Sequence, residues 1–598
     1  MKLTRLFIQN FRNFESLDIA LDGNSVIVGE NGVGKSNLLY ALRLLFDPSL
    51  PDSARQLSRE DFCDALARPL GNASIKVFVE LTDFETSPNQ LAILGEYRLD
   101  DDEKTVRLSY EFRPLSDLDR HPETDADYEF ICYGGESGTN AFGHQLRRRL
   151  AMDVLPALRD AESDLAIWRR SPLRPLLERA LTKVSDADMA EVSEAIQTAT
   201  TRLTDFVAVQ QLETAIRDLY RDMSGPKQDL SPSLGFGATQ VTRLYRTLKM
   251  LIDEGRRSVS EASLGSANVL YLTLKTLELR QLMREQRRDH SMLAIEEPES
   301  HLHPHLQRSV YRHLFQDLAG GDQALSLWLT THSPHVASVA PLRSLVLLRQ
   351  SREGRTVAAS SAQINLPPSE IDDLQRYLDV TRAEMLFARG IILVEGDAEK
   401  FLFPVFAASL GHDLDHLGIT ICSVAGTNFK PYAKFLTMLG IPFSVVTDWD
   451  PVGDDKKPLG FTRSWRLVEA ILTARKSKRK EALIESIKVM SDGNEFASVC
   501  EKFGVFSNFH TLEIDLFKSN KFTSLIIQTL RERKWSEERD NWIVEWEEEP
   551  KKLNSENYLK LIDAFSKGRF AQRLATRVQG VKPPKYIADA IEFVVSRV

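Results

Sequence analysis

The sequence predicts a multidomain α/β protein, and three observations support this prediction. The chain of 598 residues is too long for one hydrophobic core and suits about three to five structural units. Short apolar runs typical of buried strands alternate with helical patterns. Several of these runs stop abruptly at acidic residues. Because α/β sheets bind ligands at the carboxyl ends of their strands, these acidic ends mark candidate sites.

The composition is that of an ordinary soluble globular protein, with 42% hydrophobic and 27% charged residues. No stretch reaches the roughly 20 apolar residues of a membrane span, and the first residues alternate like a strand, so we expect a cytoplasmic protein without membrane association. The four cysteines are scattered, which favours neither a disulfide framework nor a zinc site. The net charge of −9 argues against bulk coating of nucleic acid, and the basic runs at 146–150, 284–288 and 475–480 are local tracks or simply solvated faces.

A phosphate-binding loop stands between a strand pattern and a helix pattern in "NSVIVGENGVGKSNLLYALRLLF". In this GxxxxGKS form, glycine N–H groups wrap the phosphates, Lys35 reaches the outer phosphates and Ser36 ligates Mg²⁺. The sequence therefore predicts an ATP site. The loop residues expected to bind the nucleotide are Asn31, Gly32, Gly34, Lys35 and Ser36.

Two further strands complete the predicted ATP site. In "SMLAIEEPESHLHP" the apolar run ends at Glu296, which we expect on the metal side, and Glu297 is placed to polarise an attacking water. In "SLWLTTHSPHV" the strand ends at His332, which is suited to sensing the γ-phosphate, although a lone histidine there is more often structural. The first half of the chain is therefore predicted to be an ATPase.

Together, the phosphate-binding loop, "EEPESHLHP" and "TTHSPH" resemble the ABC-type ATPase heads of the recombination-protein F and SMC group. In that group a serine-glycine signature from one protomer completes the site of the other. The closest matches are Ser263 and Gly265 in "EASLGSANVLYLTL", which departs widely from the usual LSGGQ form. The resemblance implies a homodimer that sandwiches ATP. A helical insertion at about 160–225 either adds dimer contacts or packs on its own head.

From about residue 385 the pattern changes to strand, helix, strand, helix, strand, which implies a parallel sheet. The first strand ends in Glu395, with Glu399 one helical turn later, and the third ends in Asp448 and Asp450. In extended chain these two aspartates point to the same side, so the four carboxylates should face one crevice. Oxygen-only ligands suit Mg²⁺ or Mn²⁺ far better than zinc. The alternative is two ordinary turns with solvated acids.

"VEGD" and "DWD", separated by a strand–helix unit with an "AGTN" turn, resemble the Toprim domain of topoisomerases, primases and certain nucleases. An ABC-type head followed by Toprim is similar to the overcoming-lysogenization-defect (OLD) nucleases, including the Gabija type. This resemblance implies two-metal cleavage of DNA, with Glu513 as a further acid and Lys567, in "SKGRFAQRLA", neutralising the scissile phosphate. The expected metal ligands are Glu395, Glu399, Asp448, Asp450 and Glu513, with Ser36 and Glu296 at the ATP site, and the expected catalytic residues are Lys567, Glu395, Asp448 and Glu297.

The predicted domains are an ATPase domain at 1–159 and 226–375, interrupted by the helical insertion at 160–225, and a Toprim domain at 376–598. A charged helical stretch at about 455–560, with Trp535, Trp542 and Trp546, should insert into the Toprim domain and shape its DNA-facing wall. We expect an ATP-regulated DNA endonuclease or nickase, acting as a homodimer or tetramer in antiphage defence, in one class with a UvrD-like helicase. The alternative is a non-cleaving, ATP-driven DNA-binding or repair-loading protein.

Overall fold

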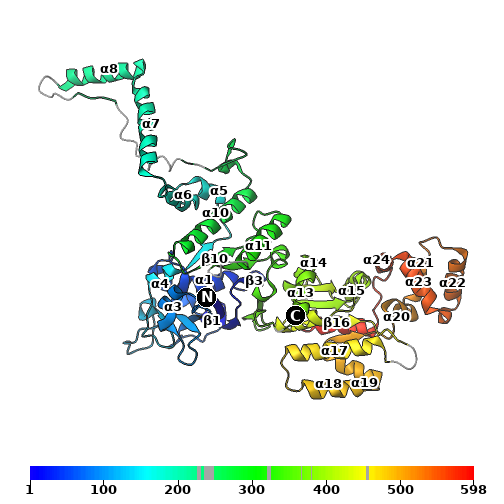
Figure 1. Ribbon diagram of the computed structural model, residues 1–598. Coiled ribbons are helices and arrows are strands. Elements are labelled where there is room, and N and C mark those ends of the chain that lie inside the picture. The colour runs from blue at the N-terminus through cyan, green and yellow to red at the C-terminus, as the bar shows by residue number, and fades with distance from the viewer. Residues whose placement is uncertain are drawn as a thin grey trace. The chain divides into compact units, whose positions relative to one another are not determined.

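The computed structural model describes residues 1–224, 231–234, 248, 250–319, 325–364, 366–378, 380–452 and 457–598. The chain forms two compact units, of which the first comprises residues 1–155, 292–299 and 304–598 and the second residues 156–291 and 300–303. Within the first unit, an N-terminal part carries the phosphate-binding loop and a C-terminal part, from β14 onward, carries the acidic strand ends (Figure 1). In the described part of the chain, no helix has the length and apolarity that crossing a membrane requires.

The N-terminal part is built on two sheets. One sheet is antiparallel with the order β2-β1-β4-β5-β6, and the other is mixed with the order β13-β12-β3-β11-β10-β7. Strand β3 pairs in parallel with β11 and β12 and is buried along its whole length. The antiparallel strands are β1 (Lys2–Phe11), β2 (Phe14–Ala20), β4 (Ile75–Thr82), β5 (Val106–Pro114) and β6 (Tyr128–Gly134). The mixed-sheet strands are β3 (Ser25–Gly29), β7 (Leu150–Leu155), β10 (His290–Glu296), β11 (Leu325–Thr331), β12 (Leu345–Gln350) and β13 (Thr356–Ser360).

Strand β3 leads directly into the phosphate-binding loop, and the loop leads into α1 (Lys35–Phe46). Gly34 ends the loop with a φ of +96°, and a Cβ on it would lie 2.0 Å from Asn13 Nδ2, so the position requires glycine. Leu38 and Leu42 bury one face of α1 in the core of the N-terminal part. The loop is therefore held between a buried strand and a buried helix.

A four-stranded parallel sheet with the order β15-β14-β16-β17 lies in the C-terminal part. Its strand pairs are all parallel, so the carboxyl ends of the strands meet at one edge. Glu395 follows β14, Asp448 follows β16 and Asn508 follows β17. This arrangement confirms the predicted parallel sheet and adds the short strand β17, which the sequence pattern did not predict. The strands are β14 (Gly390–Val394), β15 (Ile419–Ser423), β16 (Phe443–Thr447) and β17 (Val505–Ser507).

Helices surround this sheet, and several of them bring distant segments together. Helix α15 (Asp397–Ser409) packs against α24 (Lys567–Arg577), and α25 (Lys585–Val595) packs on β14, β16 and β17. The other helices of the C-terminal part are α16 (Lys430–Met438), α17 (Leu459–Ala474), α18 (Lys480–Val489), α19 (Gly493–Glu501), α20 (Leu512–Lys518), α21 (Thr523–Leu530), α22 (Glu537–Glu548) and α23 (Ser555–Phe565). The remaining helices of the first unit are α2 (Asp52–Arg55), α3 (Pro88–Leu94), α4 (His144–Arg149), α11 (Pro304–Ala319), α12 (Pro334–Ala337), α13 (Pro368–Tyr377) and α14 (Val380–Ala383).

The three tryptophans of the inserted helices belong to the hydrophobic core of the C-terminal part. Trp546 is 1% exposed, and its ring centroid lies 6.3 Å from that of Phe517 and 5.9 Å from that of Tyr558. Trp535 and Trp542 pack against the same cluster. The large apolar ring of Trp546 is therefore taken up by an aromatic cluster inside the fold, and the expectation that the stretch at about 455–560 shapes a DNA-facing wall stays a prediction.

The second unit is largely helical. A small core holds α5 and α10 together and is formed by Ala161, Leu165, Val259, Ala267 and Leu274. The elements of this unit are α5 (Ala161–Ala166), α6 (Leu173–Leu181), α7 (Asp186–Thr204), α8 (Val207–Ser224), the hairpin of β8 (Leu251–Ile252) and β9 (Arg257–Ser258), and α10 (Leu264–Arg284).

Helix α8 carries an apolar stripe that the described part of the chain leaves exposed. Leu212, Leu219 and Met223 are 56%, 61% and 80% exposed, and Ile216 is 38% exposed. Their spacing of three and four residues places them on one helix face. An exposed apolar stripe of this kind is typical of a surface that contacts another polypeptide.

Replacing Trp546 with alanine tests the position of this side chain in the core. Because the ring is buried, we expect Trp546→Ala to lower the free energy of unfolding by about 3–5 kcal/mol, which thermal unfolding of the full chain would detect as an earlier transition. Val544→Ala is the matched control, since Val544 lies on the same helix and is 42% exposed. Equal thermal stability of the two variants would contradict the packing described for Trp546.

Candidate nucleotide and metal sites

The phosphate-binding loop holds its lysine over the loop backbone. Lys35 is 8% exposed, and its Nζ donates to the carbonyl oxygens of Gly29 at 3.0 Å and Glu30 at 2.7 Å. Burial lowers the pKa of Lys35 to about 8, although the negative charges of Glu297 and Glu299 act to raise it. A desolvated ammonium group on a glycine-rich loop is suited to pair with phosphate oxygens.

The acidic end of β10 faces this lysine. Glu297 has a φ of +44°, and its N–H donates to Thr330 O of β11 at 2.9 Å, so the residue after the strand turns sharply. Glu299 accepts from Thr331 Oγ1 and from the N–H of His332, both at 2.7 Å. Burial, followed by the charge of Lys35, lowers the pKa of His332. The ends of β10 and β11 are thus joined to each other near Lys35 of the loop, and the roles predicted for Glu297 and His332 stay predictions.

Other residues predicted for the ATP site occupy different places. Asn31, Gly32 and Ser36 are exposed on the loop and on the first turn of α1. Glu296 is the last residue of β10. The predicted signature residues belong to the second unit: Ser263 caps α10 by accepting from Ser266 N at 3.2 Å, and a Cβ on Gly265 would lie 2.8 Å from His301 O. The assignment of Ser263 and Gly265 to a partner's nucleotide stays a prediction.

A second set of acidic groups gathers at the carboxyl edge of the parallel sheet. Glu395 Oε1, after β14, accepts from Thr447 Oγ1 at 2.6 Å and from Asp448 N at 2.9 Å at the end of β16. Asp448 Oδ1 accepts from Asn508 Nδ2 at 2.5 Å, after β17, and from Leu512 N at 3.1 Å. Three strand ends and the start of α20 are therefore linked through two carboxylates.

Burial and mutual repulsion make this cluster electrostatically unbalanced. Burial, with the charges of Glu513 and Glu395, raises the pKa of Glu399 to about 7. Burial, with the charges of Glu395 and Glu399, raises the pKa of Asp448 to about 8. Glu399 and Glu513 are 7% and 6% exposed. Buried carboxylates that repel one another are stabilised by cations, and their oxygen-only donors suit a hard divalent ion.

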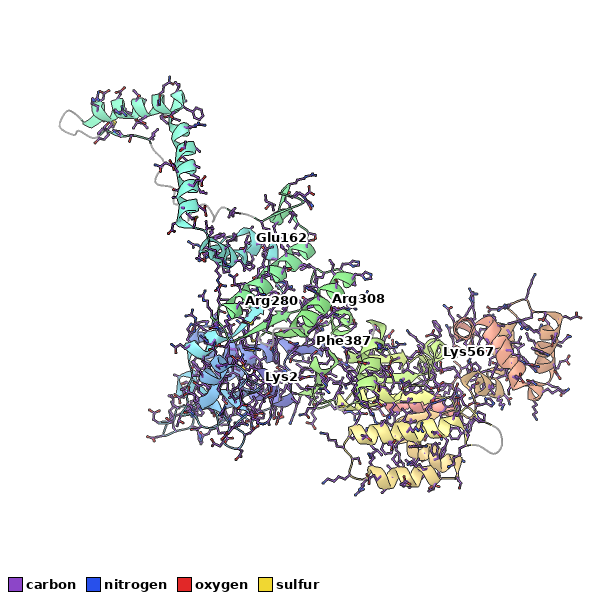
Figure 2. The ribbon with its side chains drawn as sticks, viewed as in Figure 1. Lys2, Glu162, Arg280, Arg308, Phe387 and Lys567 are labelled. Carbon is purple, nitrogen blue, oxygen red and sulfur yellow. The ribbon has the colours of Figure 1, made fainter. Side chains whose placement is uncertain are left out.

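Lys567, labelled in Figure 2, is the first residue of α24 and lies beside Glu513 of the cluster. Its Nζ is 3.8 Å from Glu513 Oε1, and about half of its side chain is exposed. Although burial alone would lower it, the pKa of Lys567 is raised by Glu513, Asp563 and Asp448. A half-exposed ammonium group beside buried acids is well placed to meet an anionic substrate.

Asp450 reaches the cluster differently from the sequence-based expectation. Strand β16 ends at Thr447, and Asp450 has a φ of +49°, so Asp448 and Asp450 do not lie in one extended segment. The turn is fixed by the N–H groups of Trp449 and Asp450, which both donate to His510 O at 3.1 Å. The prediction that strand alternation alone aligns the two aspartates is therefore wrong. Asp450 Oδ2 instead accepts from Arg463 Nη2 at 3.0 Å.

Two residues of the cluster were not found from the sequence. Arg463 on α17 donates to Glu395 and Asp450, and Asn508 donates to Asp448. Neither belongs to a motif in the sequence. The only available signal for Asn508 is its place after the short apolar run of β17.

Among the described residues, no three acidic, histidine or cysteine side chains are gathered closely enough to hold one metal ion. The carboxylates of the cluster lie close enough to repel one another. Oxygens of Glu395 and Asp450 accept hydrogen bonds from Arg463, and Asp448 accepts one from Asn508.

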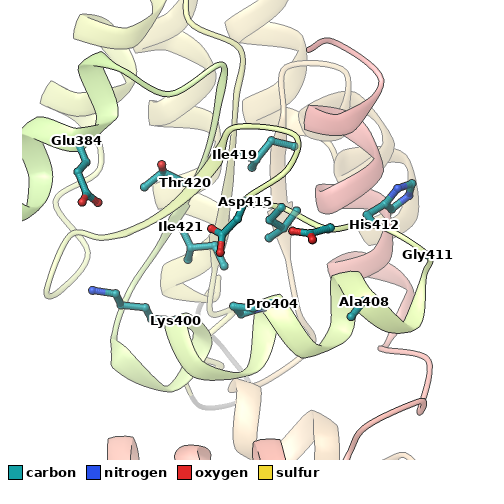
Figure 3. Close-up of a pocket in the computed structure, with 12 residues that line it drawn as sticks. Glu384, Lys400, Pro404, Ala408, Gly411, His412, Asp415, Ile419, Thr420 and Ile421 are labelled. Carbon is teal, nitrogen blue, oxygen red and sulfur yellow. The ribbon is translucent and has the colours of Figure 1, made fainter. Parts of the chain in front are cut away.

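An open cavity of about 590 Å³ lies elsewhere in the C-terminal part and does not include the acidic cluster. Figure 3 shows Lys400, Pro404 and Ala408 along one side of α15, facing the residues of β15. None of Glu395, Glu399, Asp448 and Asp450 lines it. The cavity is therefore not the site formed by the strand ends.

Two family models match the chain. The model described as "Overcoming lysogenization defect protein-like, TOPRIM domain" matches residues 386–450, and the model described as "AAA domain, putative AbiEii toxin, Type IV TA system" matches residues 25–338. The uncharacterized protein YbjD of Escherichia coli is 30% identical over 487 residues, which cover 76% of this chain and 80% of that protein. This chain belongs to the OLD family. Its two halves are accordingly an AAA-type ATPase domain and an OLD-type Toprim domain.

Other OLD-family relatives carry functional names. The OLD nuclease of Thermus scotoductus is 25% identical and covers 80% of this chain and 88% of that protein. Endonuclease GajA of Bacillus cereus is 23% identical and covers 75% of each. Among solved structures, the C-terminal region of the Burkholderia pseudomallei OLD protein is 41% identical, covers 35% of this chain and 98% of that chain, and has a TM-score of 0.30.

Lys35→Ala tests whether the loop of the AAA domain binds nucleotide independently of the Toprim cluster. We expect affinity for a fluorescent ATP analogue to fall by at least about tenfold, because a charge-assisted phosphate contact is lost. Mn²⁺ binding measured without nucleotide should stay unchanged. Lys104→Ala, at an exposed position, is the control. Loss of nucleotide-free Mn²⁺ binding in Lys35→Ala alone would contradict two separate sites.

Proposed function

We propose that this OLD-family chain is a metal-dependent DNA endonuclease or nickase whose Toprim domain cuts and whose ATPase domain regulates cutting. The observation that carries the proposal is the buried carboxylate cluster beside Lys567. Divalent cations would balance the negative charge of such a cluster, and a lysine at its edge would contact the phosphate of a DNA phosphodiester. The names of the relatives, OLD nuclease and endonuclease GajA, support the same reaction class.

In this proposal Glu395, Glu399, Asp448, Asp450 and Glu513 are the groups that would hold Mg²⁺ or Mn²⁺. When bound, two such ions would supply Lewis acidity and an activated water. The chain's own contribution is to fix Glu395 and Asp448, at the ends of two neighbouring strands, through hydrogen bonds from Thr447 and Asn508. Lys567 would bind the scissile phosphate and balance the charge that develops there.

A contact between the two domains gives the ATPase a route to the Toprim site. Arg389 donates from Nε to Glu30 Oε1 at 2.6 Å and from Nη2 to Glu30 Oε2 at 2.9 Å. Glu30 belongs to the phosphate-binding loop, and Arg389 immediately precedes β14, which ends one residue before Glu395. This hydrogen bonding lowers the pKa of Glu30, so the pair is ionic. We propose that nucleotide at the loop acts on Glu395 through this pair.

The proposal also covers the oligomeric state of the protein, its partner proteins and the biological process in which it acts. The exposed stripe of α8 is the surface that a second copy would cover in a homodimer or tetramer. The chain has one phosphate-binding loop motif and lacks the second motor core of a helicase, so DNA unwinding would come from a partner such as a UvrD-like helicase. We also propose that the activity serves antiphage defence, and the resemblance to OLD nucleases supports this proposal.

Supercoiled plasmid tests the nuclease proposal. With Mn²⁺ or Mg²⁺, the wild-type chain should produce nicked or linear DNA, and Glu395→Ala should abolish the product because a metal ligand is lost. Lys567→Ala should slow cutting by about 100-fold or more. Lys560→Ala, on the neighbouring helix α23 and paired with Glu556, is the control and should cut normally. No cutting by wild type with any metal or nucleotide would instead favour a non-cleaving DNA-binding protein.

Breaking the pair between the domains tests regulation. In Glu30→Gln we expect ATP binding to stay within a few-fold of wild type, while the factor by which ATP changes the cutting rate moves toward one. The charge-exchanged variant Glu30→Arg with Arg389→Glu should recover part of that factor. Glu15→Gln, which breaks a surface pair with Arg355, is the control. An unchanged ATP effect in Glu30→Gln would contradict the route through β14.

A further inference from the structure

Arg463 occupies the centre of the acidic cluster, although no motif includes it. It lies in the second turn of α17, and its Nη1 donates to Glu395 Oε1 at 2.8 Å and to Thr447 Oγ1 at 2.6 Å. The same nitrogen reaches Asp448 O at 3.0 Å. Its Nη2 donates to Asp450 Oδ2 at 3.0 Å. One guanidinium group therefore joins the end of β14 to both aspartates of the turn after β16.

This ion pair is largely shielded from water. The side chain of Arg463 is 15% exposed, that of Glu395 is 17% exposed and that of Asp450 is 32% exposed. A pair in this environment is weakly screened, so its two partners influence each other strongly. Removing the positive charge would leave the carboxylates of Glu395 and Asp450 without the counter-charge that they share.

The guanidinium takes oxygens that a divalent cation would use. Glu395 Oε1 already accepts three hydrogen bonds, and one oxygen of Asp450 is also engaged. Among the described residues, no three acidic, histidine or cysteine side chains form a group able to hold a metal ion, and Arg463 occupies oxygens that such a group would need. A guanidinium group is not deprotonated in proteins, so Arg463 leaves these oxygens only by moving its side chain.

The backbone of α17 cannot move easily to release them. Leu459 N donates to Asp450 O at 3.2 Å, and Gly460 N donates to Trp449 O at 2.9 Å. A Cβ on Gly460 would lie 2.6 Å from Asp448 O, so the first turn of the helix is in close contact with the aspartate turn. The side chain of Arg463, rather than the helix, is the part free to change position.

We propose that Arg463 is a built-in counter-cation of the Toprim metal site. It holds Glu395 and Asp450 in place before metal binds, and it gives up these contacts when a divalent cation takes their oxygens. Metal affinity is therefore set by a competition between the ion and a side chain of the protein. This inference deepens the proposed function, since it concerns the same site, but it is tested by metal binding without DNA.

The test compares Arg463→Gln with wild type in nucleotide-free Mn²⁺ titrations followed by calorimetry. Because a competing positive charge is removed, Arg463→Gln should bind Mn²⁺ on the order of tenfold more tightly. Its metal-free form should unfold at a lower temperature than wild type, and saturating Mn²⁺ should raise that temperature by more than in wild type. Arg463→Lys keeps the charge but cannot reach both carboxylates, so its affinity should lie between the two.

Arg466→Gln is the matched control. It removes the same charge from the same helix, but Arg466 is exposed and lies over the ring of Trp465. It should bind Mn²⁺ as wild type does. Equal or weaker Mn²⁺ binding by both Arg463→Gln and Arg463→Lys, with a normal control, would overturn the proposal. If Arg463→Gln fails to fold, Arg463→Lys decides alone. A wild-type chain that binds Mn²⁺ but cuts no DNA would refute the nuclease function and leave the role of Arg463 open to this same test.

Discussion

The repulsion among carboxylates at one edge of a parallel sheet is the constraint on which the rest of the Toprim domain depends. Parallel strands bring their carboxyl ends together, and this sheet places acids there that are partly or fully buried. Burial and neighbouring charge raise the pKa of both Glu399 and Asp448. A fold that gathers such groups must supply positive charge, and it does so with Arg463 inside the cluster and Lys567 at its rim.

The two acidic regions of the chain differ in what surrounds them. At the end of β10, Glu297 faces a buried lysine on a glycine loop, which is the arrangement of a nucleotide site. At the end of β14, Glu395 faces an arginine and other acids, without a glycine cradle. The ion pair of Glu30 with Arg389 connects the two regions through β14. The chain thus combines two candidate phosphate sites, and this ion pair is a short physical path between them.

Much of this organisation could be predicted from the sequence, because it depends on local patterns. The glycine loop, the apolar strands and the acids that end them are contiguous in the chain, and their order indicated both domains. What could not be predicted depends on contacts between distant segments. Asn508 reaches the cluster only because β17 pairs with β16, and Arg463 only because α17 packs on β17 and against the turn after β16. Trp546 enters the core through its contact with Tyr558 of α23. The left-handed conformation of Asp450 likewise follows from hydrogen bonds to His510, far along the chain.

The central claim is that the acidic cluster, and not the ATP site, performs metal-dependent cleavage of DNA. The most direct measurement is the rate of Mn²⁺-dependent nicking of supercoiled plasmid by Asp448→Asn, compared with wild type at equal protein concentration. Asparagine keeps the shape of Asp448 and its place beside Asn508, but removes the negative charge that a metal needs. The account predicts loss of nicking with unchanged ATP binding. Nicking by Asp448→Asn at the wild-type rate would contradict it.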